Sequence, residues 1–266
     1  MAKHKLAILC DFDGTVAKGD VGHSIYTRFG DERWEEINKR WRKGEISSKE
    51  CLIGEYALMD ASEDEVREYT LTMEIDSGFI ELVKTCKENN IPIAIVSDGF
   101  DFYINTILEK YGLSEIEVLC NNLIFKGRKV ELSFPYYELG CGKCGNCKVL
   151  HVERLKDKDK TVIYIGDGLS DKYASQASDI IFAKDELMEY LENNNIRYNK
   201  FRGLSEVNNW LIGLISGSVE LTESSRKIDS DCEKKEEKNI IRNLRMIKEK
   251  KDMGDGRYII YYDWKE

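Results

Sequence analysis

The segment Leu6-Ala-Ile-Leu-Cys-Asp11-Phe-Asp13-Gly-Thr15 decides how this chain folds and where its chemistry lies. Its apolar run predicts a buried strand, because strands of a parallel sheet are covered on both faces and carry few polar residues. Side chains alternate along a strand, so Asp11 and Asp13 project to the same side at its carboxyl end. Two carboxylates about 4 Å apart repel each other by roughly 4 kcal/mol at an effective dielectric of about 20. We therefore expect a bound divalent cation, or a proton on one acid, rather than a strand end that merely faces water.

The composition narrows the class of protein. The chain has 266 residues, enough for a sizeable core, and a net charge of −9. Charged residues make up 33% of the chain without forming a basic stripe. This argues against nucleic acid as a partner and is compatible with a small phosphorylated metabolite. The sequence contains no apolar run long enough to span a membrane and no secretory signal pattern, so we expect no membrane association and a cytoplasmic location.

Strand and helix patterns alternate along most of the chain. They predict an α/β fold, a doubly wound and mostly parallel sheet of Rossmann-like type. We expect strands at 6–12, 92–97, 116–119, 162–166 and 180–183. We expect helices at 76–89, 102–111, 147–156, 171–177 and 184–193. Residues 122–134, with Gly127 between two apolar runs, predict a β-hairpin.

The long segment between the first two strands carries helical patterns and no convincing strand. These patterns lie at 20–29, 31–42, 48–59 and 62–73. Ser62 and Glu65 have the spacing of a capping box. Such an insertion is too long for a crossover, so we expect an all-helical cap that closes over the site and excludes water.

These patterns divide the chain into four parts. We expect an α/β core at 1–16 and 76–214, a helical cap at 17–75, and a hairpin with a cysteine-rich loop at 119–147 within the core. Residues 215–266 are expected to be a charged linker, a helix with its apolar face on Ile240, Ile241, Leu244 and Ile247, and an aromatic strand at 257–264. This tail carries no recognisable chemistry, and we expect it to pack on the domain or on a second subunit of a homodimer.

Later segments bring further polar groups to the same edge of the sheet. Ser97 closes the second strand and can donate a hydrogen bond, while Asp98 and Gly99 follow it, with Gly99 allowing close backbone approach to an oxyanion. Asp167 ends the strand at 162–166, and Asp171 follows four residues later, where it can also act as a helix cap. Carboxylates at strand ends suit Mg²⁺, which takes one or two protein carboxylates and keeps several waters.

A lysine supplies the missing positive charge. Lys148 opens the helix before the Asp167 strand, directly after the cysteine-rich loop. A lysine taken alone is ordinarily a surface residue, so its place among the other segments carries the argument. Lys160 is closer to the strand, but it stands in a polar turn.

Taken in order, these segments resemble the four motifs of haloacid-dehalogenase-superfamily phosphatases. The matching residues are Asp11-Phe-Asp13-Gly-Thr15, Ser97, Lys148 and Gly166-Asp167-Gly-Leu-Ser-Asp171, and the likeness spans residues 5–214. The helical cap resembles the phosphoserine-phosphatase-like branch. The cysteine-rich loop running into a lysine resembles the methionine-salvage 2-hydroxy-3-keto-5-methylthiopentenyl-1-phosphate phosphatases and the phosphoethanolamine/phosphocholine phosphatases.

The resemblance implies a role for each of these residues. Asp11 would attack phosphorus and form an aspartyl-phosphate, and Asp13 would act as general acid and then as general base. Mg²⁺ would be held by Asp11, the backbone carbonyl of Asp13 and Asp167, with Asp171 binding directly or through water. Phosphate oxygens would be stabilised by Ser97, the backbone at Asp98 and Gly99, and Lys148.

Asp98 departs from the phosphoserine phosphatases, which usually carry glycine at this position. An extra acid beside a phosphate site repels a dianion unless it faces away. One hypothesis is that Asp98 recognises an amine or hydroxyl of the leaving group. The alternative is that it caps the following helix.

The cysteines suggest a second metal. Cys141, Cys144 and Cys147 form a C-x2-C-x2-C run, and Cys120 before the hairpin is the candidate fourth ligand of a structural Zn²⁺. In a reducing compartment a disulfide framework is not expected. A reduced, metal-free loop is the alternative.

Two classes of function remain open at this point. The first is a phosphomonoester hydrolase, whose substrate could be the methionine-salvage ester, phosphoserine, phosphoethanolamine or phosphocholine. The second is a phospho-accepting regulatory module without turnover. Receiver modules, however, lack a helical insertion after the first strand and need no acid like Asp13. Candidate side chains for the leaving group include Asp20, His23, Tyr26 and Arg28.

Overall fold

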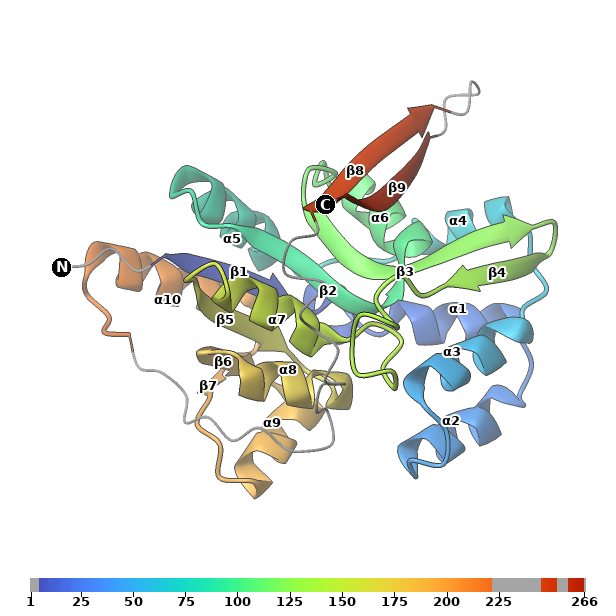
Figure 1. Cartoon of the computed structure of the whole chain (residues 1–266), viewed down its shortest axis with the longest axis horizontal. Helices are drawn as coiled ribbons and strands as arrows, with labels where there is room; N and C mark the ends of the chain where they lie inside the picture. The colour runs from blue at the N-terminus through green and yellow to red at the C-terminus, as the bar shows by residue number, and fades with distance from the viewer. Residues whose placement is uncertain (1–4, 222–244, 253–257, 266) are drawn as a thin grey trace. The chain divides into compact units, whose positions relative to one another are not determined.

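The computed structural model describes residues 5–221, 245–252 and 258–265, the last two stretches by their backbone alone. It divides into two units, Met1–Cys232 and Glu233–Glu266. The first unit carries every residue discussed above as part of the site. Figure 1 shows its strands and helices in chain order.

A seven-stranded sheet forms the centre of the first unit, in the order β4-β3-β2-β1-β5-β6-β7. All its neighbours pair in parallel except β3 and β4. The strands are β1 (Leu6–Cys10), β2 (Ile93–Phe100), β3 (Glu117–Lys126), β4 (Lys129–Ser133), β5 (Thr161–Gly166), β6 (Ile180–Ala183) and β7 (Asn199–Lys200). The predicted doubly wound, mostly parallel sheet is confirmed.

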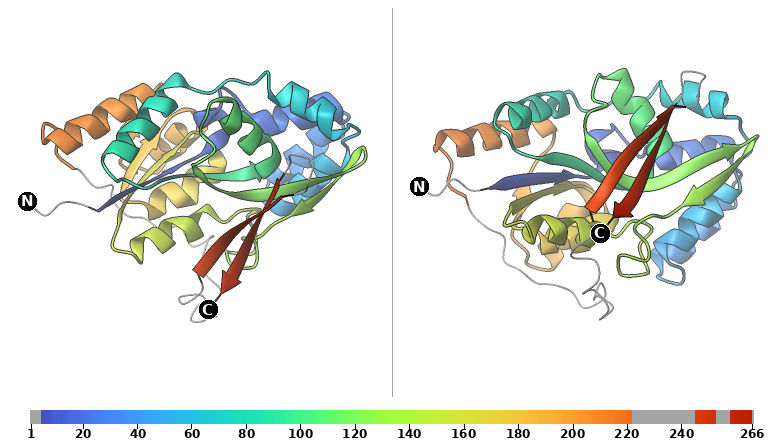
Figure 2. Two further views of the ribbon diagram at one scale, coloured as in Figure 1. Left: turned by 90° about the horizontal axis from the view of Figure 1, so that it is seen from above. Right: turned by 45° about the horizontal axis from the view of Figure 1, so that its top comes forward.

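Helices cover both faces of this sheet. The views in Figure 2 place α5, α6 and α10 on one face and α7 and α8 on the other. The helices outside the cap are α5 (Ser77–Glu88), α6 (Asp101–Lys110), α7 (Lys148–Lys156), α8 (Lys172–Ala177), α9 (Asp185–Asn193) and α10 (Leu204–Ser216). Each of the five helices expected in this part has a counterpart, and α10 lies beyond them.

β1 lies in the middle of the sheet, between β2 and β5, and this position determines where the candidate site forms. Cys10, its last residue, pairs with Ile95 of β2 on one side and with Ile165 of β5 on the other. The carboxyl ends of these three strands therefore lie next to one another, where open α/β sheets bind ligands. The acids after β1, the serine in β2 and the acid after β5 are brought together by this register.

The segment between β1 and β2 is helical throughout its regular parts. It contains α1 (Val21–Phe29), α2 (Trp34–Arg42), α3 (Ser48–Ala57) and α4 (Glu63–Thr70). Both α3 and α4 begin with a capping box, formed by Ser47 with Glu50 and by Ser62 with Glu65. These reciprocal hydrogen bonds satisfy backbone donors that a helix start leaves open, which is why the polar sequence at each start still forms a helix.

This insertion leaves the core and returns to it at the same place. Ala17 and Ile75 form an isolated antiparallel bridge, and Lys18 N donates to Glu74 O at 2.9 Å. Buried side chains of the insertion, such as Ile25 and Met59, belong to the same hydrophobic cluster as β1 and β2. The helical insertion is therefore packed against the core, over the carboxyl end of the sheet.

The predicted hairpin is confirmed, and its first strand is longer than expected. Asn122–Lys126 of β3 pairs antiparallel with β4, while the earlier part of β3 pairs with β2. The hairpin also contacts the insertion, because Lys129 Nζ donates to Met59 O at 2.8 Å and Arg128 Nε to Asp60 Oδ1 at 2.6 Å. It ties the cap to the sheet.

The second unit corrects one expectation about the tail. Its described residues form an antiparallel pair of strands, β8 (Arg245–Asp252) and β9 (Tyr258–Lys265). The aromatic strand is confirmed, but the helix expected through Ile247 is wrong, since Ile247 lies in β8. Ile240, Ile241 and Leu244 lie outside the described residues. Helical spacing over so short an apolar run does not separate helix from strand.

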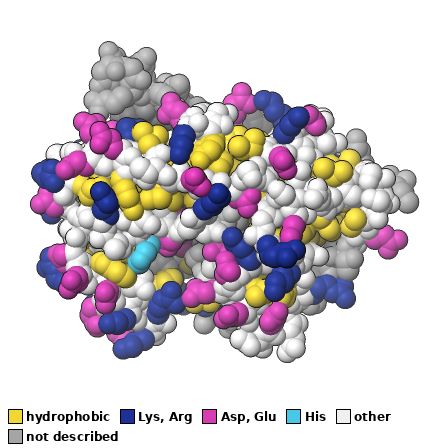
Figure 3. Space-filling model, turned by 180° about the vertical axis from the view of Figure 1, so that it is seen from behind, with side chains coloured by type: hydrophobic (Ala, Val, Ile, Leu, Met, Phe, Trp, Pro, Cys, Tyr) yellow, Lys and Arg dark blue, Asp and Glu magenta, His cyan; other side chains and the backbone are white. Residues whose placement is uncertain are grey.

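Charged side chains of both signs lie on the visible surface. On the face drawn in Figure 3, acidic and basic side chains are interspersed, without a continuous basic stripe among the residues that are coloured by type. Among the described helices, none has both the length and the apolar character that crossing a membrane requires.

A buried acid in the cap gives the first testable prediction. Glu55 of α3 is 3% exposed, and burial raises its pKa to about 7. The folded protein then holds a proton that the unfolded chain has released, so stability is expected to fall as pH rises from 4.5 through about 7. At roughly 1.4 kcal/mol per pKa unit, the loss is about 3 kcal/mol.

Replacing Glu55 with Gln tests this because the amide has no charge to bury. Urea unfolding between pH 5 and pH 8 should show that Glu55→Gln is increasingly more stable than the parent as pH rises. The matched control is Glu68→Gln, an exposed acid of α4, for which the difference should not change with pH. A constant difference for Glu55→Gln would contradict the prediction.

Candidate active site

Asp11, Lys148 and Asp171 form a buried charged group at the carboxyl edge of the sheet. Asp11 follows β1, Lys148 is the first residue of α7, and Asp171 precedes α8. Lys148 Nζ donates to Asp11 Oδ1 at 2.5 Å and to Asp171 Oδ1 at 2.7 Å. These residues are 5%, 4% and 0% exposed, respectively. Lys148 is thus a buried cation between two acids, not the surface residue that a lone lysine would be.

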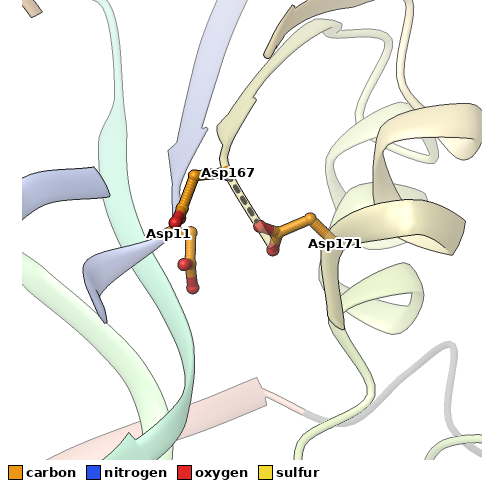
Figure 4. Close-up of side chains that lie close together, drawn as sticks. All are labelled: Asp11, Asp167 and Asp171. Atoms are coloured by element: carbon orange, nitrogen blue, oxygen red, sulfur yellow. Dashed lines mark hydrogen bonds between the residues drawn. The ribbon is translucent and has the colours of Figure 1, made fainter. Parts of the chain in front are cut away.

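Asp171 accepts more hydrogen bonds than the sequence indicated. Its Oδ1 accepts hydrogen bonds from Lys148 and from Tyr164 Oη at 2.6 Å. Its Oδ2 accepts from the backbone N–H groups of Asp167 at 3.1 Å and Gly168 at 3.2 Å, and Figure 4 shows the carboxylate of Asp171 turned towards that backbone. Both oxygens are therefore occupied, so Asp171 holds the Asp167 loop and the lysine in place.

Asp167 lies across from Asp11 and is fixed by the opening motif. Thr15 Oγ1 donates to Asp167 Oδ1 at 2.6 Å. Gly14, which directly precedes Thr15, has a φ of +78°, and a side chain on it would overlap the carboxylate of Asp167. Both its conformation and this close approach require glycine. Burial, followed by the charge of Asp171, raises the pKa of Asp167 to about 6.

The three acids form the group that could hold a metal ion. One ligand atom from each of Asp11, Asp167 and Asp171 lies within 4.8 Å of the others, the only such set among the side chains of residues 5–221. Burial and the charge of Asp171 raise the pKa of Asp11 well above its usual range, although Lys148 opposes this. Three acids facing one lysine leave an excess of negative charge. The residues therefore fit Mg²⁺, with Asp11 and Asp167 as the acids whose positions suit direct binding.

Asp13 lies apart from this group and faces the cap. Its Oδ1 accepts from Val21 N at 2.9 Å and Gly22 N at 3.3 Å, at the start of α1. Its Oδ2 accepts from Tyr103 Oη at 2.8 Å. Burial, with a contribution from the charge of Asp20, raises the pKa of Asp13 to about 7. A carboxyl group with this pKa is partly protonated near neutral pH.

Ser97 and Gly99 lie beside Asp13 at the end of β2. Ser97 is 1% exposed, and its Oγ accepts from Gly99 N at 2.9 Å and lies 3.4 Å from Asp13 Oδ2. A side chain on Gly99 would overlap the Tyr103 hydroxyl. Glycine at this position makes room for the tyrosine that bonds to Asp13.

Asp98 does not cap the following helix. Phe100 directly precedes α6, which starts at Asp101, and no side chain caps that helix start, so the helix-cap interpretation is wrong. Asp98 Oδ1 instead accepts from Asn146 N at 2.9 Å. Asn146 also donates through Nδ2 to Ser97 O at 2.9 Å, so Asp98 ties the cysteine-rich loop to β2.

The expected zinc site receives no support from the described side chains, among which the grouped metal-type ligands are the three acids. Cys141 Sγ and Cys144 Sγ lie 3.4 Å apart. Burial raises the pKa of the Cys120 thiol well above its usual range. The loop instead positions Asn146 and Lys148 through its hydrogen bonds.

Four polar side chains of the site were not predicted from the sequence to have a functional role. Thr15 stands inside the opening motif, and Tyr164 is the one aromatic residue in the β5 run, so both gave a local signal. Tyr103 in α6 and Asn146 in the loop gave none. Their roles depend on hydrogen bonds to residues far away in the chain, which no local pattern records.

Comparisons with known proteins agree with this geometry. A family model described as "Putative Phosphatase" matches residues 6–214. The "Bifunctional enzyme MtnB/MtnX" of Bacillus licheniformis is 32% identical over 207 residues, which cover 76% of this chain and 48% of that enzyme, so the chain spans about half its length. The "2-hydroxy-3-keto-5-methylthiopentenyl-1-phosphate phosphatase" of Bacillus mycoides is 32% identical over 206 residues, covering 76% of this chain and 94% of that protein.

A solved structure shows the same fold. The "Phospho-Aspartyl Intermediate Analogue of Phosphoserine phosphatase" is 24% identical, with a TM-score of 0.62, covering 78% of this chain and 99% of that one. The family match extends over the sheet, the cap and the residues of the site. The chain therefore belongs to the "Putative Phosphatase" family, and it is a phosphatase of the haloacid-dehalogenase superfamily.

Proposed function

We propose that the protein is a Mg²⁺-dependent phosphomonoester hydrolase that acts through an aspartyl-phosphate on a small methionine-salvage-type ester. The observation that carries the proposal is the arrangement of two acids with different surroundings at one strand end. Asp11 lies against Lys148 among charged groups, whereas Asp13 lies against backbone N–H groups and Tyr103. Such a division suits one acid as nucleophile and the other as proton carrier.

Hydrolysis would proceed in two displacements. The Asp11 carboxylate attacks phosphorus, the bond from phosphorus to the leaving oxygen breaks, and Asp13 gives its proton to that oxygen. Water then attacks the aspartyl-phosphate, Asp13 takes the proton of this water, and the bond from phosphorus to Asp11 breaks. Inorganic phosphate leaves and both acids return to their starting states.

The remaining residues would stabilise charge on the transferring group. Mg²⁺, when bound by Asp11, Asp167 and the backbone carbonyl of Asp13, supplies positive charge to the phosphate oxygens. Lys148 adds a second positive charge beside Asp11, and Ser97 with the backbone at Asp98 and Gly99 offers hydrogen-bond donors. Asp171 keeps Lys148 and the Asp167 loop in position. Because the chain belongs to a phosphatase family, release of phosphate is proposed rather than signalling by a stable phosphoaspartate.

The charges around Asp13 influence which kind of leaving group the site favours. Among charged side chains, Asp20 contributes most to the raised pKa of Asp13. A carboxylate near the ester, as in phosphoserine, would be repelled there. A neutral leaving group is favoured, as in the ester named for the relative from Bacillus mycoides. The acid at position 20 also supports a second candidate, an amine-bearing leaving group such as that of phosphoethanolamine or phosphocholine.

A substrate panel tests the proposal. Purified protein would be assayed for phosphate release from 2-hydroxy-3-keto-5-methylthiopentenyl-1-phosphate, phosphoserine, phosphoethanolamine and phosphocholine, with Mg²⁺ and with EDTA. We expect Mg²⁺-dependent hydrolysis, with kcat/KM highest for the methylthiopentenyl ester and lowest for phosphoserine. Highest activity on the amines would favour the second candidate, and hydrolysis unaffected by EDTA would contradict the metal assignment.

A further inference from the structure

The hydroxyl group of Tyr56 is buried without a hydrogen-bond partner. Tyr56 lies in α3 of the cap, is 1% exposed, and its Oη has no partner in the structure. Its ring is held edge-on against Phe100, with centroids 4.6 Å apart, and against Tyr26 at 5.9 Å. These contacts fix the direction of the hydroxyl. Buried hydroxyls are nearly always partnered in folded proteins, so an unpaired one at this place requires an explanation.

The Tyr56 hydroxyl lies beside Gly22, whose backbone N–H bonds to Asp13. The three heavy atoms nearest to where a side chain would begin on Gly22 are all oxygens: Tyr103 Oη at 3.2 Å, Tyr56 Oη at 3.4 Å and Asp20 Oδ1 at 3.5 Å. Gly22 N itself donates to Asp13 Oδ1 at 3.3 Å. Because position 22 is a glycine, no side chain fills the space that these oxygens share.

The other two oxygens already have partners. Tyr103 Oη donates to Asp13 Oδ2, and Asp20 Oδ1 accepts from His23 N at 2.7 Å. The charge of Asp13 is the largest electrostatic influence on Tyr56, ahead of that of Asp20, which agrees with a hydroxyl close to the proposed proton carrier. Among these three oxygens, the Tyr56 hydroxyl is therefore the one whose O–H donor has no acceptor. A hydroxyl oxygen placed there could accept from Tyr56 and donate to Asp20.

We propose that Tyr56 is a specificity-determining residue that donates a hydrogen bond to a neutral oxygen, hydroxyl or carbonyl, on the carbon next to the ester carbon of the substrate. The inference rests on the proposed function, because it takes Asp13 as the acid that protonates the leaving oxygen. In such an ester, an oxygen on the neighbouring carbon lies close to the leaving oxygen, and the Tyr56 hydroxyl lies near Asp13 through their shared neighbour Gly22. Substrates that lack it leave the Tyr56 hydroxyl unpaired, which penalises their binding.

Two esters that differ by one hydroxyl test this inference. For the parent protein, kcat/KM should be at least about tenfold higher for propane-1,2-diol 1-phosphate than for n-propyl phosphate, the effect of one well-placed neutral hydrogen bond. Tyr56→Phe should reduce this ratio to within about twofold of one. The matched control is Tyr69→Phe, another tyrosine of the helical insertion, whose ring packs against Phe29 with centroids 5.6 Å apart. It should keep the parent ratio.

Thermal unfolding provides a second measurement. Because Tyr56→Phe removes an unpaired buried hydroxyl, it should raise the Tm of the protein without substrate by about 2–4 °C. A clear fall in Tm would show that the hydroxyl has a structural partner and would overturn the inference. Gly22→Ala offers an independent variant, since its methyl group enters the space and should also abolish the preference for the diol ester.

The outcomes separate this inference from the proposed function. If the parent protein hydrolyses both esters equally, or if Tyr56→Phe and Gly22→Ala keep the parent ratio, the role of Tyr56 is wrong while the phosphatase activity stands. If the parent protein hydrolyses no phosphomonoester with Mg²⁺, the proposed function fails first.

Discussion

Replacing Asp11 with Asn is expected to abolish phosphate release while the protein stays folded. The amide is a poor nucleophile, so the aspartyl-phosphate cannot form, and loss of a covalent nucleophile commonly lowers kcat by more than about 10⁴-fold. The fold should tolerate the change because Asn has nearly the same shape and removes one of three clustered negative charges. Phosphate release at saturating substrate, with circular dichroism and thermal unfolding of the same preparation, measures both expectations.

A matched control separates the nucleophile from a general effect of losing an acid. Asp159→Asn changes a side chain that is 92% exposed and forms only a surface ion pair with Lys5 at 3.4 Å, so activity should be unchanged. A folded Asp11→Asn protein that retained even a tenth of parental kcat would refute the covalent mechanism. Denaturing gel analysis after a brief reaction with ³²P-labelled substrate should show label on the parent protein and none on this variant.

Replacing Lys148 with Met is expected to damage both activity and stability. The side chain of Lys148 is 3% exposed and bridges Asp11 and Asp171, whose side chains are 7% and 0% exposed. Removing one partner of a buried ion pair leaves uncompensated charge, at a cost of about 3–5 kcal/mol in the free energy of unfolding. Activity should fall by at least about 10²-fold, because a positive charge beside the transferring phosphate is lost.

Urea unfolding and kcat measurements, each at pH 7.5, test this prediction. The control is Lys87→Met, which removes an exposed pair with Glu115 at 2.8 Å and should leave stability nearly unchanged. If Lys148→Met were as stable as the control, the bridge would not be a buried charge pair of the kind described. If its kcat were unchanged, the proposed role in phosphate stabilisation would be wrong.

The sequence indicated the fold for reasons that act over short distances. The apolar run before Asp11 and the run before Asp167 are both strands, as predicted, and the structure pairs them side by side. Parallel strands joined by helices have their carboxyl ends at one edge, so acids at those ends converge without further information. The capping box at Ser62 and Glu65 is equally local, and the structure shows both of its hydrogen bonds.

The errors concern groups whose direction is set by distant contacts. Asp98 lies near the end of β2, two residues before a helix start, yet its side chain bonds to Asn146 of the cysteine-rich loop and not to that helix start. The helix expected through Ile247 is a strand whose partner, β9, begins further along the chain at Tyr258. Spacing alone does not specify which of these pairings forms.

The sequence by itself determined that Asp11 and Asp13 end a buried strand and that Asp167 ends another strand at the same edge of the sheet. Alternation along strands and the topology of parallel sheets are sufficient for that. Lys148 was assigned to the site only through its place among the motifs. Only the tertiary structure decided how the acids are distinguished. Lys148 bridges Asp11 and Asp171, whereas Asp13 is directed to α1 and Tyr103 under the cap. The physical reason is that the charge state and orientation of a carboxylate depend on burial and on hydrogen-bond partners, which come from segments far apart in the chain.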